Sequence, residues 1–454
     1  MGTIPNRGGP GNRGGFVVSQ YEEQAVAAEF LDRVCKHVRA KDLHADIREE
    51  LSSHIAEQIE IFQEEGMPRE GAASEAIRLM GDPDLIGRNL HKAHRPVIEW
   101  KLLSIFALMA LIGIFGAFTV QQSGSYPQFG TLLLEKKVLF TLMGLVGFIV
   151  FYFMDYRKIQ NYSGALFFST LLIMAYTIYA DNTINGMQGF LIIGPIGINV
   201  MVVSPLLLLL SLAGMKQTKE WRGVEHLFQL VYRGLLPTIL FCLGSSWFNG
   251  CIYLFGFFWM TWITKKNMAQ FLMLVLPLIS LYIFTLSRVE QLYHRLHAFL
   301  NPVGEDSYQL IQTKAAIYSA GWMGQGFAAK NEMLPYLYSD SLFPYLIHCF
   351  GWGAGILVAG LIIWCMVRIW KMHGHIRDEY AKRIWIGFMA VLGVRMLWPL
   401  LMAFGIVPII GGELPFIGGG AIQIFDYAAA GFLLSIFRRK NMIPRERGDA
   451  LQRH

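Results

Sequence analysis

Long apolar segments fill most of this chain after residue 98. Runs near the length needed to cross a bilayer, roughly 17–25 residues, occur near 100–120, 137–154, 163–180, 199–215, 268–286, 343–367, 383–404 and 417–437. The region 232–264 is also apolar but is interrupted between Gly244 and Gly250, so we expect two short spans joined by a tight turn there. The sequence therefore predicts an all-α, polytopic membrane protein with about ten transmembrane helices.

Charged residues gather before the first apolar run. Only 16% of all residues are charged, against about 25% in a typical soluble protein, and residues 16–98 are rich in them. We predict a small helical cytoplasmic domain at 16–98, because no short apolar core of a secretory signal precedes it. Residues 1–15 are rich in Gly, Asn and Arg and are expected to form a disordered tail.

The N-terminal domain has apolar residues at helical spacing. This pattern predicts helices over 23–39 and 44–65, a third starting at Pro68, and a fourth ending near His91 after the break at Gly81-Asp-Pro83. The pattern from Glu50-Leu51 to Gly81-Asp-Pro83 resembles a helical prefix domain found ahead of bacterial membrane proteins and permeases. We expect a docking or regulatory bundle without a catalytic constellation.

Lysine and arginine predict the orientation of the spans. With the N-terminus inside, the cytoplasmic connections contain a large set of basic residues: Arg157, Lys158, Lys216, Lys219, Arg222, Arg233, Lys265, Lys266, Arg368, Lys371, Arg377, Lys382 and Arg383. The opposite connections contain only Lys136 and Lys137 before residue 287. Because basic residues favour the cytoplasmic side, both termini, including the tail 441–454, are predicted to be cytoplasmic. The loop 287–342 is predicted to lie outside.

This loop is a polar segment of more than fifty residues that ends just before an apolar run. Its last polar residues include Ser339 and Asp340, a pair that is typical of a helix N-terminus. An outward-facing carboxylate at the mouth of a span is also suited to chemistry. The residues by themselves leave both roles open for Asp340.

Several ordered motifs in the membrane half resemble one family. The outer loop contains Arg295-Leu-His-Ala-Phe-Leu-Asn-Pro302, Tyr308-Gln309, Gly321-Trp-Met-Gly-Gln-Gly326 and Leu334-Pro-Tyr-Leu-Tyr-Ser-Asp340. Gly411-Gly-Glu-Leu-Pro-Phe-Ile-Gly-Gly-Gly420 precedes the last apolar run, and a weaker match combines Asn185-Gly186 with Gly194-Pro195. Their order resembles the SEDS family (shape, elongation, division and sporulation; FtsW/RodA/SpoVE type), over roughly residues 99–440.

This resemblance implies an enzyme of the bacterial cytoplasmic membrane that polymerises lipid II into peptidoglycan strands on the outer face. It implies Asp340 as the catalytic base, a divalent cation (Mg²⁺ or Mn²⁺) with no organic cofactor, and a class B penicillin-binding protein as partner. Arg295 is the first candidate for binding the diphosphate, because a guanidinium fork suits phosphate oxygens. Lys330 would add charge, and Tyr308 and Gln309 would contact the sugar. The ligands of the metal are not identified.

Structural alternatives exist for the same side chains. Arg295 would form an ordinary salt bridge with Glu290 or Glu305, Lys330 would be a solvated loop lysine, and Tyr308 with Gln309 would order the loop. Glu413 beside the second motif either lines the substrate cavity or, as the plainer interpretation, lies at its rim. Nucleic acid is not expected as a partner, since no basic patch is interleaved with exposed aromatic residues; membrane lipid is.

The sequence also departs from the family pattern. Residues 199–205 lack a charged pair, residues 245–250 lack an acid, and Gln325 stands where a lysine is usual. These losses favour a non-catalytic membrane scaffold or regulator of cell-wall synthesis as the main alternative, with a transporter of lipid-linked precursors as a third hypothesis.

Two ionisable residues interrupt late apolar runs. Arg395 lies in the middle of one run and Asp426 lies in the last. An unpaired charge at the bilayer centre costs at least about 2.5 kcal/mol, so we predict that these two side chains pair with each other across neighbouring spans.

Overall fold

The computed structural model describes residues 13–125, 132–183, 188–194, 196–215, 228–264, 268–287, 289–304, 307–376 and 378–440. Several expectations concern residues outside these ranges: the tails 1–12 and 441–454, Asn185, Gly186, Pro195, Lys216, Lys219, Arg222, Lys265, Lys266, Glu305 and Arg377. The chain forms two compact units, one made of Met1–Ile98 with Arg438–His454 and the other of Glu99–Phe437. Both are helical, so the all-α prediction is confirmed.

The N-terminal unit is a helical bundle. It contains α1 (Arg13–His37), η1 (Lys41–Leu43), α2 (His44–Glu64), α3 (Arg69–Met80) and α4 (Pro83–Ala93). Helix α1 begins at Arg13, well before the expected start at residue 23, so residues 13–15 are helical and the expected tail was too long at its inner end. Asp82 caps α4 by accepting a hydrogen bond from the Asp84 N–H at 3.0 Å, with Pro83 in the first helical position.

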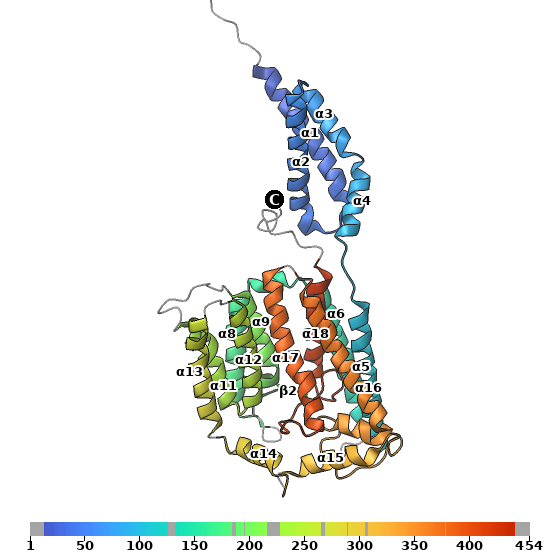
Figure 1. Cartoon of the computed structure of the whole chain (residues 1–454), viewed down its shortest axis with the longest axis vertical. Helices are drawn as coiled ribbons and strands as arrows, with labels where there is room; N and C mark the ends of the chain where they lie inside the picture. Colours follow the sequence, from blue (N-terminus) through green and yellow to red (C-terminus); the bar gives the residue numbers. More distant parts are fainter. Residues whose placement is uncertain are drawn as a thin grey trace, which may run out of the picture. The chain divides into compact units, whose positions relative to one another are not determined.

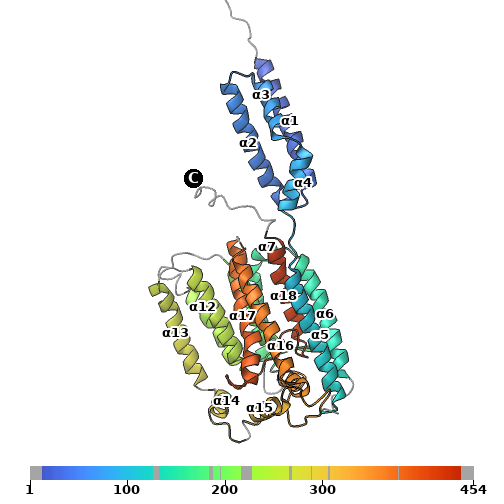
Figure 2. The same cartoon turned by 45° about the vertical axis from the view of Figure 1, so that its right-hand side comes forward.

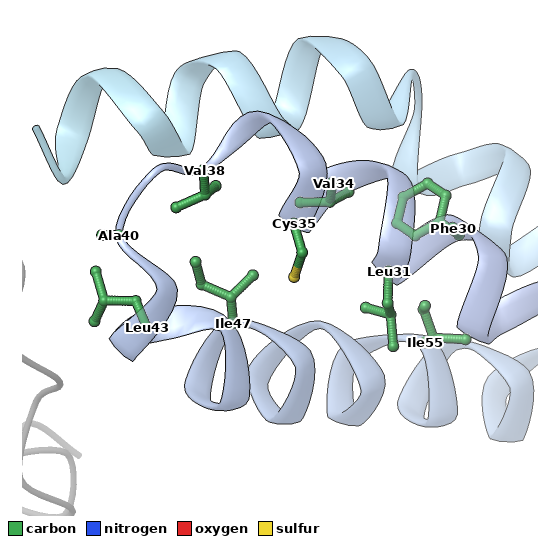
Figure 3. Packing of buried hydrophobic residues seen from close by; sticks show 9 residues of the cluster. All are labelled: Phe30, Leu31, Val34, Cys35, Val38, Ala40, Leu43, Ile47 and Ile55. Carbon is green, nitrogen blue, oxygen red and sulfur yellow. The ribbon is translucent and has the colours of Figure 1, made fainter.

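One apolar face of α1 packs against α2 (Figure 3). The spacing of three and four residues along α1 places its apolar side chains on one side of the helix. The buried cluster consists of Phe30, Leu31, Val34, Cys35, Val38, Ala40, Leu43, Ile47 and Ile55. A core of this kind shows why these short helices form a unit of their own.

The second unit is a bundle of apolar helices (Figures 1 and 2). Its helices are α5 (Trp100–Gln122), α6 (Leu132–Phe153), α7 (Arg157–Gln160), α8 (Ser163–Tyr179), α9 (Val200–Gly214), η3 (Gln229–Leu235), α11 (Leu236–Leu243), α12 (Trp247–Thr264), α13 (Met268–Leu286), α16 (Leu342–His373), α17 (Glu379–Ala403) and α18 (Gln423–Arg438). Helices α5, α6, α13, α16 and α17 are long and apolar enough to cross a membrane, while α8, α9 and the stretch Gln229–Leu243 are shorter apolar helices.

Exposed apolar side chains on the outer face of this bundle indicate whether it faces lipid or water. Leu142, Val146 and Ile149 of α6 are each more than half exposed. They follow one another at intervals of three and four residues, so they form a stripe on the outer face of the helix. An apolar stripe of this kind is typical of a surface that faces lipid rather than water.

The polar segment 287–342 contains two further helices, α14 (Glu290–Leu300) and α15 (Tyr308–Ala320). Figure 1 shows them lying across one end of the bundle. The irregular stretch 321–341 then leads into α16. A small antiparallel hairpin, β1 (Phe190–Ile193) and β2 (Ile196–Asn199), precedes α9.

The glycine-rich backbone of the outer loop packs against a break in α16. Gly351 has φ 81° and ψ −178°, which interrupts the helix. The carbonyls freed by the break accept hydrogen bonds from the Gln325 N–H (to His348 O, 2.9 Å) and the Gly326 N–H (to Cys349 O, 3.0 Å). A Cβ atom on Gly351 would lie 2.2 Å from the Trp322 carbonyl oxygen. Glycine is therefore needed at this position for both conformation and close approach.

Replacing Gly351 by alanine is expected to lower the free energy of unfolding by about 3 kcal/mol, because the new Cβ meets backbone and the conformation is nearly exclusive to glycine. Thermal unfolding in detergent measures this effect. Gly353→Ala is the matched control, since a Cβ on Gly353 has no neighbour within 4 Å. Equal losses of stability in the two variants would contradict the prediction.

Candidate functional site

The irregular segment between α17 and α18, residues 404–422, brings the candidate residues together. We call it the α17–α18 segment. It lies outside the helices and contains residues with positive φ, among them Gly405, Gly411 and Phe416. Its backbone contacts side chains from the outer loop, from α14 and from α6. These side chains are separated from it by up to about 280 residues in sequence.

Asp340 is anchored to this segment. The Gly412 N–H donates a hydrogen bond to Asp340 Oδ1 at 3.2 Å. Helix α16 begins at Leu342 with Ser341 as its N-terminal cap residue and no side-chain capping hydrogen bond. The capping alternative for Asp340 is therefore wrong. Burial raises the pKa of Asp340 above its ordinary value, while the hydrogen bond from Gly412 and the charge of Arg295 act in the opposite direction.

Arg295 on α14 reaches the same segment. Its Nη1 donates to the Ile409 carbonyl oxygen at 3.2 Å, and its charge acts on Asp340. Glu290 instead lies 3.8 Å from His294, so the alternative of an Arg295–Glu290 salt bridge is not what this part of the structure contains. The α17–α18 segment thus places a guanidinium near the Asp340 carboxyl group.

Glu413 is half-buried, and its carboxyl group is bound by the backbone of its own segment. Its Oε2 accepts a hydrogen bond from the Gly420 N–H at 2.8 Å. A Cβ on Gly418 would lie only 2.7 Å from the same oxygen, so the carboxyl group rests on the backbone of its own segment. Burial raises the pKa of Glu413 to about 7; the charge of Asp340 adds to this rise, while the hydrogen bond from Gly420 and the charge of Lys137 oppose it. Two carboxyl groups are therefore held at the α17–α18 segment, and the charge of Asp340 acts on Glu413.

Lys137 on α6 is the residue that sequence reasoning missed. Its side chain is 1% exposed, and its Nζ donates to four oxygens: Phe416 O (2.9 Å), Ile417 O (3.2 Å), Gly418 O (2.6 Å) and Gln423 Oε1 (2.6 Å). The expected position of Lys137 in an outer connection was wrong, because it lies inside the bundle. The available signal was its place as first residue of the apolar run 137–154, where a lysine is costly unless it has partners.

Glycine in α5 makes room for the Lys137 side chain. A Cβ on Gly113 would lie 2.8 Å from the Lys137 Nζ and 2.7 Å from the Ile417 carbonyl oxygen. Beside this contact is a mostly apolar cavity of about 160 Å³, lined by Gly113, Ala117, Val120, Leu133, Lys136, Tyr338, Leu342, Ile417, Gly419 and Gly420. An apolar cavity therefore borders the segment that holds the two carboxyl groups.

The other predicted binding residues make contacts within the outer loop. Lys330 is exposed and forms an ion pair with Glu332 at 2.5 Å. Tyr308 is exposed and its hydroxyl lies 3.6 Å from the sulfur of Met333. Gln309 is half-buried in the first turn of α15. The structure thus joins Asp340 and Arg295 through the α17–α18 segment, whereas the recorded contacts of Lys330 and Tyr308 are with other loop residues.

An ion pair braces the two ends of the α17–α18 segment. Arg395 on α17 and Asp426 on α18 form a bidentate pair, with Nη2 donating to Oδ2 at 3.3 Å and a second, shorter bond from Nη1 to Oδ1. Asp426 is 2% exposed. Because the pair joins the helices on either side of the segment, it limits how far the segment's ends can separate.

Comparison with known proteins identifies the family. A sequence profile of the FtsW/RodA/SpoVE family, described as cell cycle protein, matches residues 98–442. The probable peptidoglycan glycosyltransferase FtsW of Saccharophagus degradans is 24% identical over 331 residues, 69% of this chain and 84% of that protein. The peptidoglycan glycosyltransferase MrdB of Helicobacter pylori is 23% identical over 315 residues, 66% of this chain and 79% of that protein.

Solved structures share the fold. A chain of a peptidoglycan synthase complex, described as coordinating polymerization and crosslinking, superposes with a TM-score of 0.61 at 19% identity, covering 75% of this chain and 97% of that one. The rod shape determining protein RodA of Thermus thermophilus superposes with a TM-score of 0.55 at 18% identity, covering 75% and 96%. With the profile matching most of its length, this chain belongs to the FtsW/RodA/SpoVE family of membrane proteins, the SEDS family.

Proposed function

We propose that this protein is a membrane glycosyltransferase that polymerises lipid II into peptidoglycan glycan strands on the outer face of the bacterial cytoplasmic membrane. The observation that carries the proposal is the Asp340 carboxyl group, which is held by the Gly412 N–H and influenced by the Arg295 charge. The matched relatives, which are named peptidoglycan glycosyltransferases, support the same reaction class.

Asp340 acts as general base in the proposed reaction. Its carboxylate accepts the proton of a sugar hydroxyl while that oxygen bonds to the anomeric carbon of a second, lipid-linked sugar. The bond from the anomeric carbon to the diphosphate oxygen breaks, and the undecaprenyl diphosphate leaves with the electron pair. The guanidinium of Arg295 stabilises the charge that develops on this leaving group. A raised pKa of Asp340 suits a base that works near neutral pH.

Lys330, Tyr308 and Gln309 are proposed to contact the sugar and diphosphate from the outer loop. The apolar cavity between α5 and the α17–α18 segment offers a surface for the apolar part of the substrate. The outer loop is proposed to lie outside the cell, with both termini in the cytoplasm. The reason is that most basic residues lie in the connections on the other side of the membrane, and such residues favour the cytoplasmic side. A class B penicillin-binding protein is the proposed partner that crosslinks the strands.

We further propose that the divalent cation, Mg²⁺ or Mn²⁺, enters with the diphosphate of the substrate. Among the residues that the structure describes, no three His, Cys, Asp or Glu side chains gather in a group that would hold a metal ion. Mg²⁺ usually keeps several waters and takes phosphate oxygens as ligands. The substrate would therefore supply most of the ligands of the cation.

Chelation of divalent cations is expected to lower the rate of polymer formation at least about tenfold, because the diphosphate then leaves without its counter-charge. The measurement compares polymer made in EDTA, in EDTA with excess Mg²⁺, and in EDTA with excess Ca²⁺. Recovery is expected with Mg²⁺. An unchanged rate in EDTA would reject the cation requirement while leaving the role of Asp340 in place.

The polymerase proposal is tested directly with purified protein and labelled lipid II. Polymer is resolved by gel electrophoresis, with and without a class B penicillin-binding protein. The wild-type protein is expected to make strands that a muramidase degrades. If no condition yields polymer, the glycosyltransferase proposal fails and the scaffold hypothesis replaces it.

A further inference from the structure

We propose that the buried amino group of Lys137 anchors the α17–α18 segment at the catalytic site, and that its positive charge, when it is protonated, favours ionisation of the Asp340–Glu413 carboxyl pair. Lys137 is thus a positioning residue, and the inference rests on the proposed function of Asp340. The charge acts through the segment rather than through direct contact with substrate.

The partners of Lys137 are all uncharged. Its Nζ is surrounded by three consecutive backbone carbonyls, of Phe416, Ile417 and Gly418, and by the amide oxygen of Gln423. An ammonium group has three N–H donors, so these oxygens satisfy it fully. They do not cancel its charge. A buried charge of this kind acts strongly on ionisable groups nearby, because the surroundings screen it weakly.

Two carboxyl groups lie close enough to be influenced by Lys137, those of Glu413 and Asp426. Asp426 is already engaged by Arg395 in a bidentate ion pair. Glu413 instead accepts a hydrogen bond from the Gly420 N–H. Within the described part of the chain, Glu413 is therefore the carboxyl group that gains most from the Lys137 charge.

A short stretch of backbone connects Lys137 to Asp340. The Gly418 carbonyl oxygen accepts from Lys137 at 2.6 Å, and the Glu413 carboxyl group rests against the same glycine, where a Cβ would be 2.7 Å from Oε2. The residue before Glu413 is Gly412, whose N–H binds Asp340 at 3.2 Å. Moving the Lys137 anchor would thus move the backbone that holds both carboxyl groups.

Loss of the Lys137 charge changes the pKa of Glu413 in one direction, upward. Burial and the negative charges of Asp340 and Asp426 raise the pKa of Glu413 to about 7, against the opposing effects of the hydrogen bond from the Gly420 N–H and of the Lys137 charge. Removing the ammonium leaves only the hydrogen bond from the Gly420 N–H to oppose burial and the two negative neighbours, so the pKa of Glu413 rises further. Because Asp340 and Glu413 interact, their titrations are coupled, and the pH at which the pair ionises moves upward.

The test uses the full-length protein without substrate, and follows the infrared band of protonated carboxyl groups as pH is raised. In Lys137→Met this band is expected to persist about one pH unit or more above its wild-type range. Adding Glu413→Gln to Lys137→Met is expected to remove the persisting band. Lys101→Met removes an exposed lysine from α5 and should titrate like the wild type. Because no substrate is present, this readout is independent of whether the protein polymerises lipid II.

A relocated charge separates electrostatics from loss of packing. In the double variant Lys137→Met with Gln423→Lys, an ammonium enters the same set of carbonyl oxygens from α18, and the wild-type titration is expected to return. The same series in the polymerisation assay is expected to show the acidic limb of the pH–rate profile shifted upward in Lys137→Met and restored in the double variant.

Three outcomes would overturn the inference. The first is a monodisperse Lys137→Met protein that titrates like the wild type. The second is a folded double variant that titrates above the wild type. The third is failure of both Lys137→Met and the double variant to fold, because the ammonium at position 423 is expected to be enough to hold the α17–α18 segment. If the wild-type protein makes no polymer, the proposed function is rejected. The infrared titration can still be measured in that case, so the two failures are distinguishable.

Discussion

Asp340→Asn is expected to lower the rate of polymer formation by at least about 100-fold, because a general base contributes roughly 10²–10⁴ to the rate of such a reaction. Asparagine has nearly the size of aspartate, and its amide oxygen can still accept the hydrogen bond from the Gly412 N–H. It cannot accept a proton from a sugar hydroxyl at neutral pH. The substitution therefore removes the chemistry while preserving the contact with the α17–α18 segment.

Gel electrophoresis of products from labelled lipid II measures the effect, under conditions where the wild type is far from exhausting its substrate. Asp181→Asn is a matched control: it makes the same chemical change at a site where φ is 48° and where asparagine is well tolerated. We expect wild-type rates from this control. Equal polymer from Asp340→Asn and the wild type would remove Asp340 as the base, even if the protein proves to be a polymerase.

The sequence predicts the helices well, because hydrophobic length carries the signal for spans. Each predicted apolar run contains a helix in the structure, although α18 begins at Gln423 rather than near residue 417, and the pair expected at 232–264 appears as α11 and α12 with a turn between them. The start of α1 was misjudged, since residues 13–22 have little apolar periodicity and yet belong to the helix. Apolar periodicity indicates which residues of a helix are buried, and it does not indicate how far the helix extends.

The candidate site was only partly predictable. Motif order placed Asp340 and Arg295 together, but their common partner is backbone, at Gly412 and Ile409. Peptide N–H and C=O groups recur along the chain whatever the side chains are, so a sequence pattern does not predict contacts with them. The same reason hid Lys137, whose partners are mostly carbonyls about 280 positions away. Side-chain chemistry is visible in a sequence, whereas the main-chain surface that organises it appears only after folding.

The charges at Arg395 and Asp426 illustrate the opposite case, in which both partners are side chains. Two lone ionisable residues in neighbouring apolar runs left few alternatives to mutual pairing. The structure contains this ion pair, with Nη2 of Arg395 3.3 Å from Oδ2 of Asp426. Its position on α17 and α18 gives it a structural role beside the site.

Asp426→Asn is expected to lower the free energy of unfolding by about 3–5 kcal/mol, because it leaves the Arg395 guanidinium without its charged partner in a buried position. Arg395→Met should cost a similar amount, since it strands the Asp426 carboxylate. Unfolding in mixed micelles with increasing denaturing detergent measures these losses. Glu332→Gln is the control within the same unit: it breaks an exposed pair with Lys330 and is expected to cost less than about 1 kcal/mol.

The charge-swapped double variant, Arg395→Asp with Asp426→Arg, is expected to recover at least half of the stability lost in the single variants. Opposite charges then face each other again across α17 and α18, although the longer side chain starts from the other helix. A double variant as unstable as the sum of the two single changes would show that the two residues act independently. Recovery of stability with restored polymer formation would further show that the α17–α18 segment requires the attachment of its two flanking helices rather than a particular residue at either position.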